Sequence, residues 1–114
     1  TVLFPAECKE GVGARGFYEW MAAASCPQDV IDRFIKEGYS IGSSKAWLFS
    51  RCLKRAEVIV VTKCIDDQTL EKMFAKRADT IEEAVRMALA RHGEKAQIVL
   101  MRNGSDIIPR FERE

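Results

Sequence analysis

The chain has 114 residues, of which 47% are hydrophobic and 31% are charged, a composition typical of a globular protein. Its 18 Lys and Arg residues against 17 Asp and Glu residues give a formal net charge of +1, and charges of both signs alternate along the chain. This balance excludes nucleic acid and anionic membranes as expected partners. Neither a membrane-spanning apolar run nor a signal-peptide pattern is recognisable, so we expect a cytoplasmic protein.

The chain begins at Thr1, without a methionine and directly within a β-favouring run. We therefore expect one α/β domain over residues 1–114, excised from a larger two-domain protein. A chain of this length can bury a hydrophobic core without disulfides, but it is short for a complete two-domain enzyme.

The four cysteines are Cys8, Cys26, Cys52 and Cys64, with no Cys-x-x-Cys pair, and His92 is the only histidine. This spacing does not fit a zinc site, so we expect no metal in this chain. Cys52 and Cys64 fall within apolar patterns, which predicts buried, reduced thiols. Cys8 is the one candidate for a reactive thiol, because it precedes the chain's first glycines.

The first sixteen residues predict a strand, a glycine loop and the start of a helix. Residues 1–4 favour a strand, and Gly11, Gly13 and Gly16 mark a backbone that turns sharply or approaches another group closely. Open α/β sheets bind ligands at the carboxyl ends of their strands, so we expect the loop over residues 7–15 at the functional edge. The helix that follows shows apolar residues at i, i+3, i+4 and i+7, namely Phe17, Trp20, Met21 and Ala24.

Two more helices are predicted before the next strand. Ser25 and Gln28 have capping-box spacing, and Gly38 ends the first of these helices. Ser43 or Ser44 caps the second. The predicted buried stripes are Val30, Ile31, Phe34 and Ile35 in the first, and Leu48, Phe49, Cys52, Leu53 and Ala56 in the second.

The second half of the chain predicts two strands and two helices. The unbroken run Val58–Val61 is typical of a parallel strand buried on both faces. Asp66 or Asp67 caps a short helix with Leu70, Met73 and Phe74 inward, and Thr80 with Glu83 caps a helix over residues 81–91 that Gly93 closes. A third strand is expected over residues 96–101, followed by a turn at Asn103 and Gly104.

The expected element order is therefore β, α, α, α, β, α, α, β. Right-handed crossovers then give an α/β fold with a small, mostly parallel three-stranded sheet and helices on both faces. Residues 107–109 are a candidate short extra edge strand.

The candidate binding surface comes from two loop-to-helix junctions. Both precede helix N-termini, where carboxylates and other anions are stabilised, so we expect a small-anion or domain-docking surface; two solvated rims are the alternative. Trp47 lies off the apolar face of its helix and points to a cleft or a partner. The candidate residues are Glu7, Lys9, Glu10, Gly11, Gly13, Ser43, Ser44, Lys45 and Trp47.

Gly11, Gly13 and Gly16 also have G-x-G-x-x-G spacing after a strand and before a helix. In dinucleotide-binding folds an acidic residue ends the next strand about twenty residues on, whereas two further helices intervene here. A stand-alone module that binds a nucleotide or a small anion through the glycine loop remains the alternative reading. His92, near a helix end, has no Ser or Cys partner at a recognisable spacing, so no catalytic residue is predicted.

Three segments together resemble one family, and they cover nearly the whole chain: AECKEGVGARGFYEW, GSSKAWLFSRCLKRAEVIVVTK and DTIEEAVRMALARHGEKAQIVLMRNGSDIIP. In order and spacing they are similar to the C-terminal domain of the nickel-dependent lactate racemases. Members of that family typically read AEC-x-EG-x-G-x-x-x-F, then G-x-HKA, T-x-EEA and VMP-x-G-x-x-x-P. The opening AEC, EG and G are the most specific part of the resemblance.

The resemblance implies the C-terminal half of a cytoplasmic, bacterial two-domain isomerase of 2-hydroxy acids. In that family a lysine and a histidine of the N-terminal half hold a nickel pincer nucleotide derived from nicotinic acid. Two N-terminal histidines move the proton while hydride passes between lactate and the pincer ring. None of those residues lies in this chain, and the family's Gln- and Lys-bearing helix would precede Thr1. We therefore expect a fragment without catalytic residues, metal or cofactor that is inactive alone.

Two departures from the family pattern concern the substrate. Ser44, Lys45 and Ala46 stand where HKA is common, and Met101 and Arg102 stand where MP is common. These changes put lactate itself in doubt within the class of small 2-hydroxy acids. The expected partners are such a substrate and the missing N-terminal catalytic domain, which the candidate surface would face across a cleft.

Overall fold

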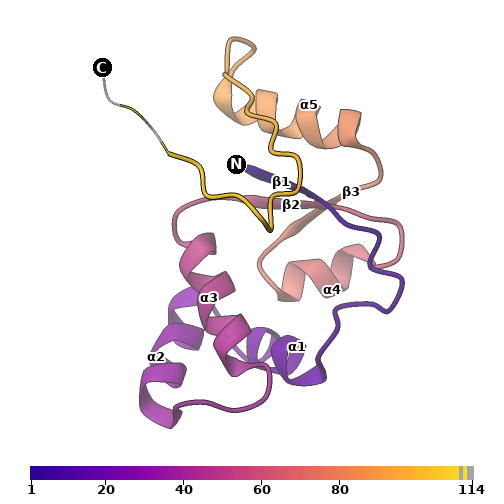
Figure 1. The fold of residues 1–114 in the computed structure, drawn as a ribbon. Helices are drawn as coiled ribbons and strands as arrows, with labels where there is room; N and C mark the ends of the chain where they lie inside the picture. The colour runs from indigo at the N-terminus through magenta and orange to yellow at the C-terminus, as the bar shows by residue number, and fades with distance from the viewer. Residues whose placement is uncertain (111, 113–114) are drawn as a thin grey trace.

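Three parallel strands form the centre of the computed structural model, which describes residues 1–110 and 112 (Figure 1). They are β1 (Val2–Pro5), β2 (Val58–Val61) and β3 (Lys76–Ala78), in the spatial order β1-β2-β3. Val2 is paired with Val58 in the register of β1 and β2, and Ile59 is paired with Lys76 in that of β2 and β3. The predicted α/β class and small parallel sheet are confirmed.

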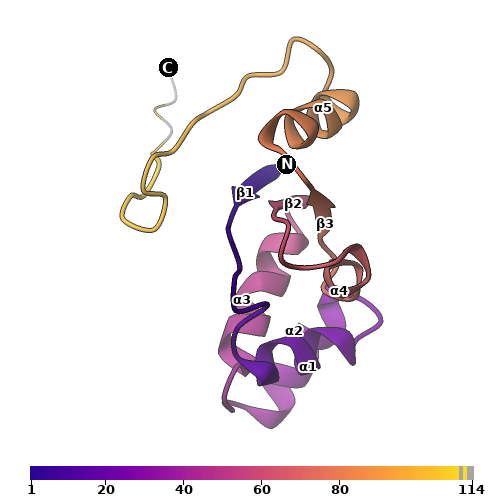
Figure 2. The same ribbon diagram turned by 90° about the vertical axis from the view of Figure 1, so that its right-hand side faces the viewer.

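Five helices cover the two faces of the sheet within the described residues. They are α1 (Arg15–Ala22), α2 (Pro27–Glu37), α3 (Ser43–Leu53), α4 (Asp67–Lys72) and α5 (Ile81–His92). Helices α1 to α4 lie on one face, and α5 lies alone on the other (Figures 1 and 2). The chain crosses the sheet in one direction, from β1 to β2 to β3, so right-handed crossovers place α1 to α4 on the same face. Helix α5 follows the last strand and covers the other face.

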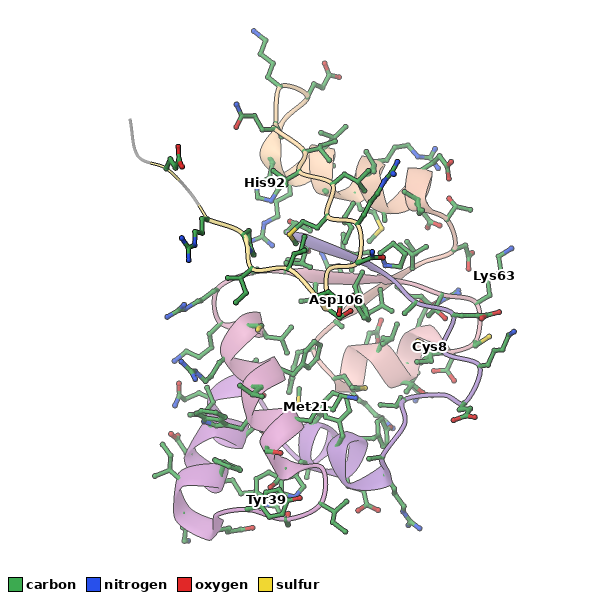
Figure 3. All side chains as sticks on the ribbon, in the orientation of Figure 1. Cys8, Met21, Tyr39, Lys63, His92 and Asp106 are labelled. Atoms are coloured by element: carbon green, nitrogen blue, oxygen red, sulfur yellow. The ribbon has the colours of Figure 1, made fainter. Side chains whose placement is uncertain are left out.

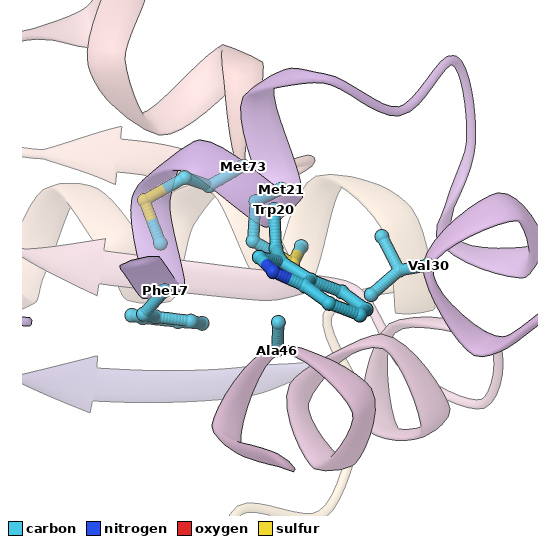
Figure 4. Packing of buried hydrophobic residues seen from close by; sticks show 6 residues of the cluster. All are labelled: Phe17, Trp20, Met21, Val30, Ala46 and Met73. Atoms are coloured by element: carbon cyan, nitrogen blue, oxygen red, sulfur yellow. The ribbon is translucent and has the colours of Figure 1, made fainter. Parts of the chain in front are cut away.

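Strand β2 is central because its side chains are buried on both faces. Val58 and Val60 pack with Ile65, Leu70 and Ala75 on the side of α4, whereas Ile59 packs with Ala78 and Ala84 on the side of α5. A third cluster joins the helices α1 to α3 to the end of α4 (Figure 4), and its buried members are Phe17, Trp20, Met21, Val30, Ala46 and Met73. The prediction of a doubly buried strand at Val58–Val61 is confirmed.

The predicted third strand over residues 96–101 is wrong. The third strand is β3, and residues 96–101 form no strand, with Leu100 82% exposed. Residues 107–109 form no edge strand either. β3 is too short and polar to be recognised from its sequence, but the free edge of β2 supplies its backbone partners, and small Ala78 fits against Ala84 of α5. The order of the last elements is therefore α4, β3, α5.

The start of α2 and its inward face also differ from the prediction. The carboxylate of Asp29 accepts hydrogen bonds from the backbone N–H groups of Ser25 (2.9 Å) and Cys26 (3.2 Å), so Cys26 is the cap. The hydrogen bond from Ser25 contributes most to lowering the pKa of Asp29, and hydrogen bonding with Cys26 lowers it further. Gln28 instead donates to Asp32, and Ile35 is 76% exposed although the apolar periodicity placed it inward.

The fully buried residues of helix α3 are small ones, while Phe49 and Leu53 of the predicted stripe are partly buried against the core. Ser43, Ala46 and Ser50 face the interior, while Leu48 and Cys52 are exposed. The helix packs against both α1 and α2, and small side chains allow that close approach. Cys64 is exposed as well, so the predicted burial of the Cys52 and Cys64 thiols is wrong.

The predicted caps of the last two helices are confirmed. Asp66 accepts a hydrogen bond from the Thr69 N–H at 2.6 Å, and Thr80 accepts one from the Glu83 N–H at 3.1 Å. These side chains satisfy N–H groups that the first helical turn leaves without backbone partners.

Candidate functional site

The glycine loop leaves the sheet at the carboxyl end of β1 and descends to the start of α1 (Figure 1). Its beginning is fixed to the sheet: the Ala6 N–H donates to the carbonyl oxygen of Val61 at 3.1 Å, and the Thr62 hydroxyl donates to that of Glu7 at 3.1 Å. The loop therefore has a defined position at the strand-end edge.

The middle of the loop depends on positive φ angles. Gly11 and Gly13 have φ angles of 73° and 89°, and the N–H of Gly11 donates to the carbonyl oxygen of Cys8 at 2.9 Å. A methyl group at either glycine would meet no atom within 4 Å, so backbone conformation selects glycine here, not crowding. Both glycines are exposed, and the loop backbone is accessible to a ligand or a domain.

The charged residues of this loop are exposed, but its cysteine is not. Lys9 and Glu7 form an ion pair at 2.8 Å, with both side chains largely in solvent, and Glu10 is exposed beside them. Cys8 is half-buried and packs with Val12 against the Val58 cluster. This burial gives Cys8 a role in packing.

The second junction touches the first through its backbone. A methyl group on Gly42 would stand 2.7 Å from the carbonyl carbon of Gly16, and one on Gly16 would overlap the carbonyl oxygen of Ile41. The starts of α1 and α3 therefore meet here without side chains between them. Sequence analysis identified Gly16 as a point of close approach but did not single out Gly42. Because Ile41 fills the open side of Gly16, the third glycine of the G-x-G-x-x-G spacing is not free to face a ligand.

The candidate residues of the second junction point in different directions. The Ser43 hydroxyl is buried, accepting from the N–H of Ser40 at 2.7 Å and donating to its carbonyl oxygen at 2.9 Å, while Ser44 is half-buried. The ammonium of Lys45 lies 4.9 Å from the ring centroid of Phe17 in α1. Trp47 faces α2 instead, so it does not join the other candidate residues.

The two helix starts that meet are positively charged. Helices α2, α4 and α5 carry an acidic residue in their first turn, whereas α1 begins with Arg15 and α3 has Lys45 in its first turn. A helix N-terminus has a partial positive charge, so a cation beside it is unfavourable unless an anion is near. Glu19 offsets the charge of Arg15 at 2.6 Å, while Lys45 forms no ion pair within the described residues.

Two features of the strand-end edge were missed by sequence analysis. Thr62 follows β2 and accepts a hydrogen bond from the Cys64 N–H at 3.2 Å, and exposed Lys63 stands between them (Figure 3). Arg77 donates to the carbonyl oxygen of Thr62 at 3.1 Å and pairs with two aspartates, chiefly Asp67, which raises its pKa. Polar residues directly after the apolar run of β2 were the available signal.

The donor groups of the described residues do not fit a nickel site. No cluster of three His, Cys, Asp or Glu side chains that could hold a metal occurs among residues 1–110 and 112. His92 lies at the opposite end of the strands from Cys8, and its Nε2 is 2.7 Å from the Thr1 hydroxyl (Figure 3). Glu57 is held by Lys76 at 2.5 Å and by Arg91 at 3.5 Å. Over the same residues, no helix has the length and apolar character to cross a membrane.

Comparison with known proteins identifies the family. The model of the lactate racemase C-terminal domain matches residues 1–109. The chain is 28% identical over 111 residues to a lactate racemase of Lactiplantibacillus plantarum, and 28% identical over 113 residues to that of Thermoanaerobacterium thermosaccharolyticum. These alignments cover 95% and 96% of this chain, but 26% of each relative, so the chain spans about a quarter of their length.

A solved structure agrees with the sequence comparison. The lactate racemase apoprotein from Thermoanaerobacterium thermosaccharolyticum superposes with a TM-score of 0.76 at 28% identity, over 81% of this chain and 23% of that one. Sequence and fold thus lead to the same family. The chain belongs to the lactate racemase C-terminal domain family.

Proposed function

We propose that this chain is the C-terminal domain of a two-domain racemase of small 2-hydroxy acids, and that it forms one wall of an interdomain active-site cleft. The match to the C-terminal domain family over residues 1–109 carries this proposal. The chain's own chemistry supports it, because its one histidine is hydrogen-bonded to Thr1 at the far end of the strands from the glycine loop. The domain is inactive alone.

The cleft wall in this proposal is the continuous surface formed by the glycine loop and the second junction. The members that face the N-terminal half are Glu7, Lys9, Glu10, Gly11, Gly13, Ser44 and Lys45. Ser43 supports the wall from within, through its bonds to Ser40. Trp47 is left out, because it faces α2.

The surface is suited to a carboxylate. Two helix N-termini meet at the junction, and Lys45 lies there without an acidic partner in the described residues. Exposed Lys63 lies nearer the sheet, as does Lys9, whose charge Glu7 partly offsets. Each helix end contributes about 0.3–1 kcal/mol to binding an anion when exposed, and more when the opposite wall excludes water. We assign this chain the binding and orientation of the substrate carboxylate, and no proton transfer.

The nickel pincer nucleotide of the family would be held by the N-terminal half in this proposal. The donors in this chain do not fit it, so no chemical step is assigned to their contact with the group. The substrate is a small 2-hydroxy acid, and the family departures at Ser44 and Arg102 leave its side chain open.

The proposal is tested in the full-length enzyme. Lys45→Ala should lower racemisation at least tenfold, about 1.4 kcal/mol of transition-state stabilisation, and Gly13→Val should do the same by displacing the loop. Lys95→Ala is the matched control, since Lys95 is an exposed lysine that follows α5, on the opposite face of the sheet from both junctions. Circular dichroism checks that each variant is folded. Wild-type turnover in Lys45→Ala and Gly13→Val would place the cleft elsewhere.

A further inference from the structure

A groove of about 700 Å³ runs along the junction of α2 and α3, on the side of α3 opposite Lys45. The proposed cleft does not use it. Each helix lines the groove with residues spaced three or four apart, as one helical face requires. The lining residues are Gln28, Ile31, Phe34 and Ile35 from α2, Trp47 and Arg51 from α3, and Lys54 and Arg55 directly after the end of α3.

The floor of the groove is apolar and accessible. The rings of Phe34 and Trp47 stack with centroids 5.2 Å apart and an interplanar angle of 21°. Ile31 is half-buried beside them, and Ile35 is 76% exposed. Burying such a surface against another apolar group is favourable by about 25 cal/mol per Å².

The rim of the groove on the side of α3 is cationic, and its side chains have no acidic partner within the described residues. Arg51, Lys54 and Arg55 form no ion pair within the described residues, and no acidic residue lines the groove. The guanidinium of Arg51 stands 4.7 Å from the ring centroid of Trp47, and Lys54 donates to Gln28. Three cations without an ion pair in the described residues thus stand together at the C-terminal end of α3, in a chain with a formal net charge of only +1.

We propose that this groove binds an acidic amphipathic helix of a partner protein. The lining residues extend from residue 28 to 35 on α2 and from residue 47 to 55 on the side of α3, roughly 10–12 Å along a helix axis, which accommodates about two turns of a third helix. Apolar residues of the partner cover Ile31 and Ile35, and its carboxylates pair with Arg51, Lys54 and Arg55. This surface is separate from the proposed cleft, and the inference does not rest on the proposed function.

Other ligand classes fit the groove less well. A small anion would leave the apolar floor uncovered, and a neutral helix would leave the cations unpaired. Single-stranded nucleic acid needs an open aromatic face for base stacking, but Phe34 and Arg51 already contact the Trp47 ring. An acidic amphipathic helix complements both the apolar floor and the charged rim.

The test uses the full-length protein that carries this chain and a fluorescein-labelled model helix with leucines on one face and flanking glutamates. Fluorescence anisotropy should show saturable binding that weakens at least about tenfold between roughly 50 mM and 500 mM salt. The same peptide with lysines in place of glutamates should not bind. Absence of saturable binding, or equal binding of the lysine peptide, would overturn the proposal.

Matched variants locate the binding site. Arg51→Glu and Arg55→Glu should each weaken binding about tenfold, and Ile35→Ser about fivefold. The controls are Arg86→Glu and Ile81→Ser, both at exposed positions of α5, each of which should stay within about twofold of wild type. Because Ile35 is already exposed, its replacement keeps the test valid if a charge reversal impairs folding. Groove variants that bind like the controls would refute the assignment.

Discussion

The contact between the starts of α1 and α3 predicts a large cost for adding a single methyl group. In Gly42→Ala the new Cβ would stand 2.7 Å from the carbonyl carbon of Gly16 and closer still to the amide nitrogen of Phe17, and the backbone φ is 87°. A positive φ costs an ordinary residue about 1–2 kcal/mol, and overpacking adds about 1–3 kcal/mol, because two backbones must separate. We expect a loss of about 2–5 kcal/mol in the free energy of unfolding.

Gly11→Ala is the matched control for that measurement. Its φ is 73°, but its Cβ would meet no atom within 4 Å, so only the conformational cost of about 1–2 kcal/mol applies. Urea unfolding of the two variants and the wild type, followed by circular dichroism, gives the difference directly. In a chain of this length a loss of 1 kcal/mol lowers the melting temperature by about 4 °C, so thermal unfolding should also distinguish Gly42→Ala from Gly11→Ala. Equal losses at the two sites would refute the claim that the helix starts are in backbone contact.

Three further predictions follow from other parts of the fold. Gly11→Val should destabilise the chain by more than Gly104→Val, whose Cβ would meet no atom within 4 Å and whose φ is not positive; equal thermal shifts would contradict this. The isolated chain should retain no stoichiometric nickel after dialysis, and retention that disappears in His92→Ala would show a site where none is expected. The hydrogen bond from Lys76 lowers the pKa of Glu57. The ionised Glu57 carboxylate therefore stabilises the fold above its unfolded-state pKa, and this stabilisation is lost as pH falls through its folded-state pKa. Glu57→Gln should flatten the acid limb of a stability–pH curve, and an unchanged limb would show that Glu57 does not contribute in this way.

Signals confined to one stretch of chain predicted the structure well. The β-branched run Val58–Val61 and the caps at Asp66 and Thr80 each need only neighbouring residues to act, and all three are confirmed. The strand prediction at residues 96–101 failed because β-propensity does not supply a pairing partner. β3 forms from a less favourable sequence because β2 offers it a free edge.

The predicted buried face was wrong in part for α3, which packs against both α1 and α2. Apolar periodicity favoured Leu48 and Cys52 in α3, but contact with α1 and α2 selects the small residues Ala46 and Ser50 for the interior. In the candidate site, too, local sequence patterns did not predict which helices pack together. The glycine spacing indicated a close approach at Gly16, yet its partner, residues 41–42, depends on a packing of α1 against α3 that no local pattern encodes.

The account is tested most directly by following the optical purity of 2-hydroxy acids with the full-length protein and with residues 1–114 alone. A panel of single-enantiomer 2-hydroxy acids, including lactate, is incubated with each, and chiral chromatography measures the opposite enantiomer. We expect the full-length, nickel-loaded protein to racemise at least one member of the panel and residues 1–114 to racemise none. Racemisation by the isolated chain, or an unchanged panel with the full-length protein, would contradict it.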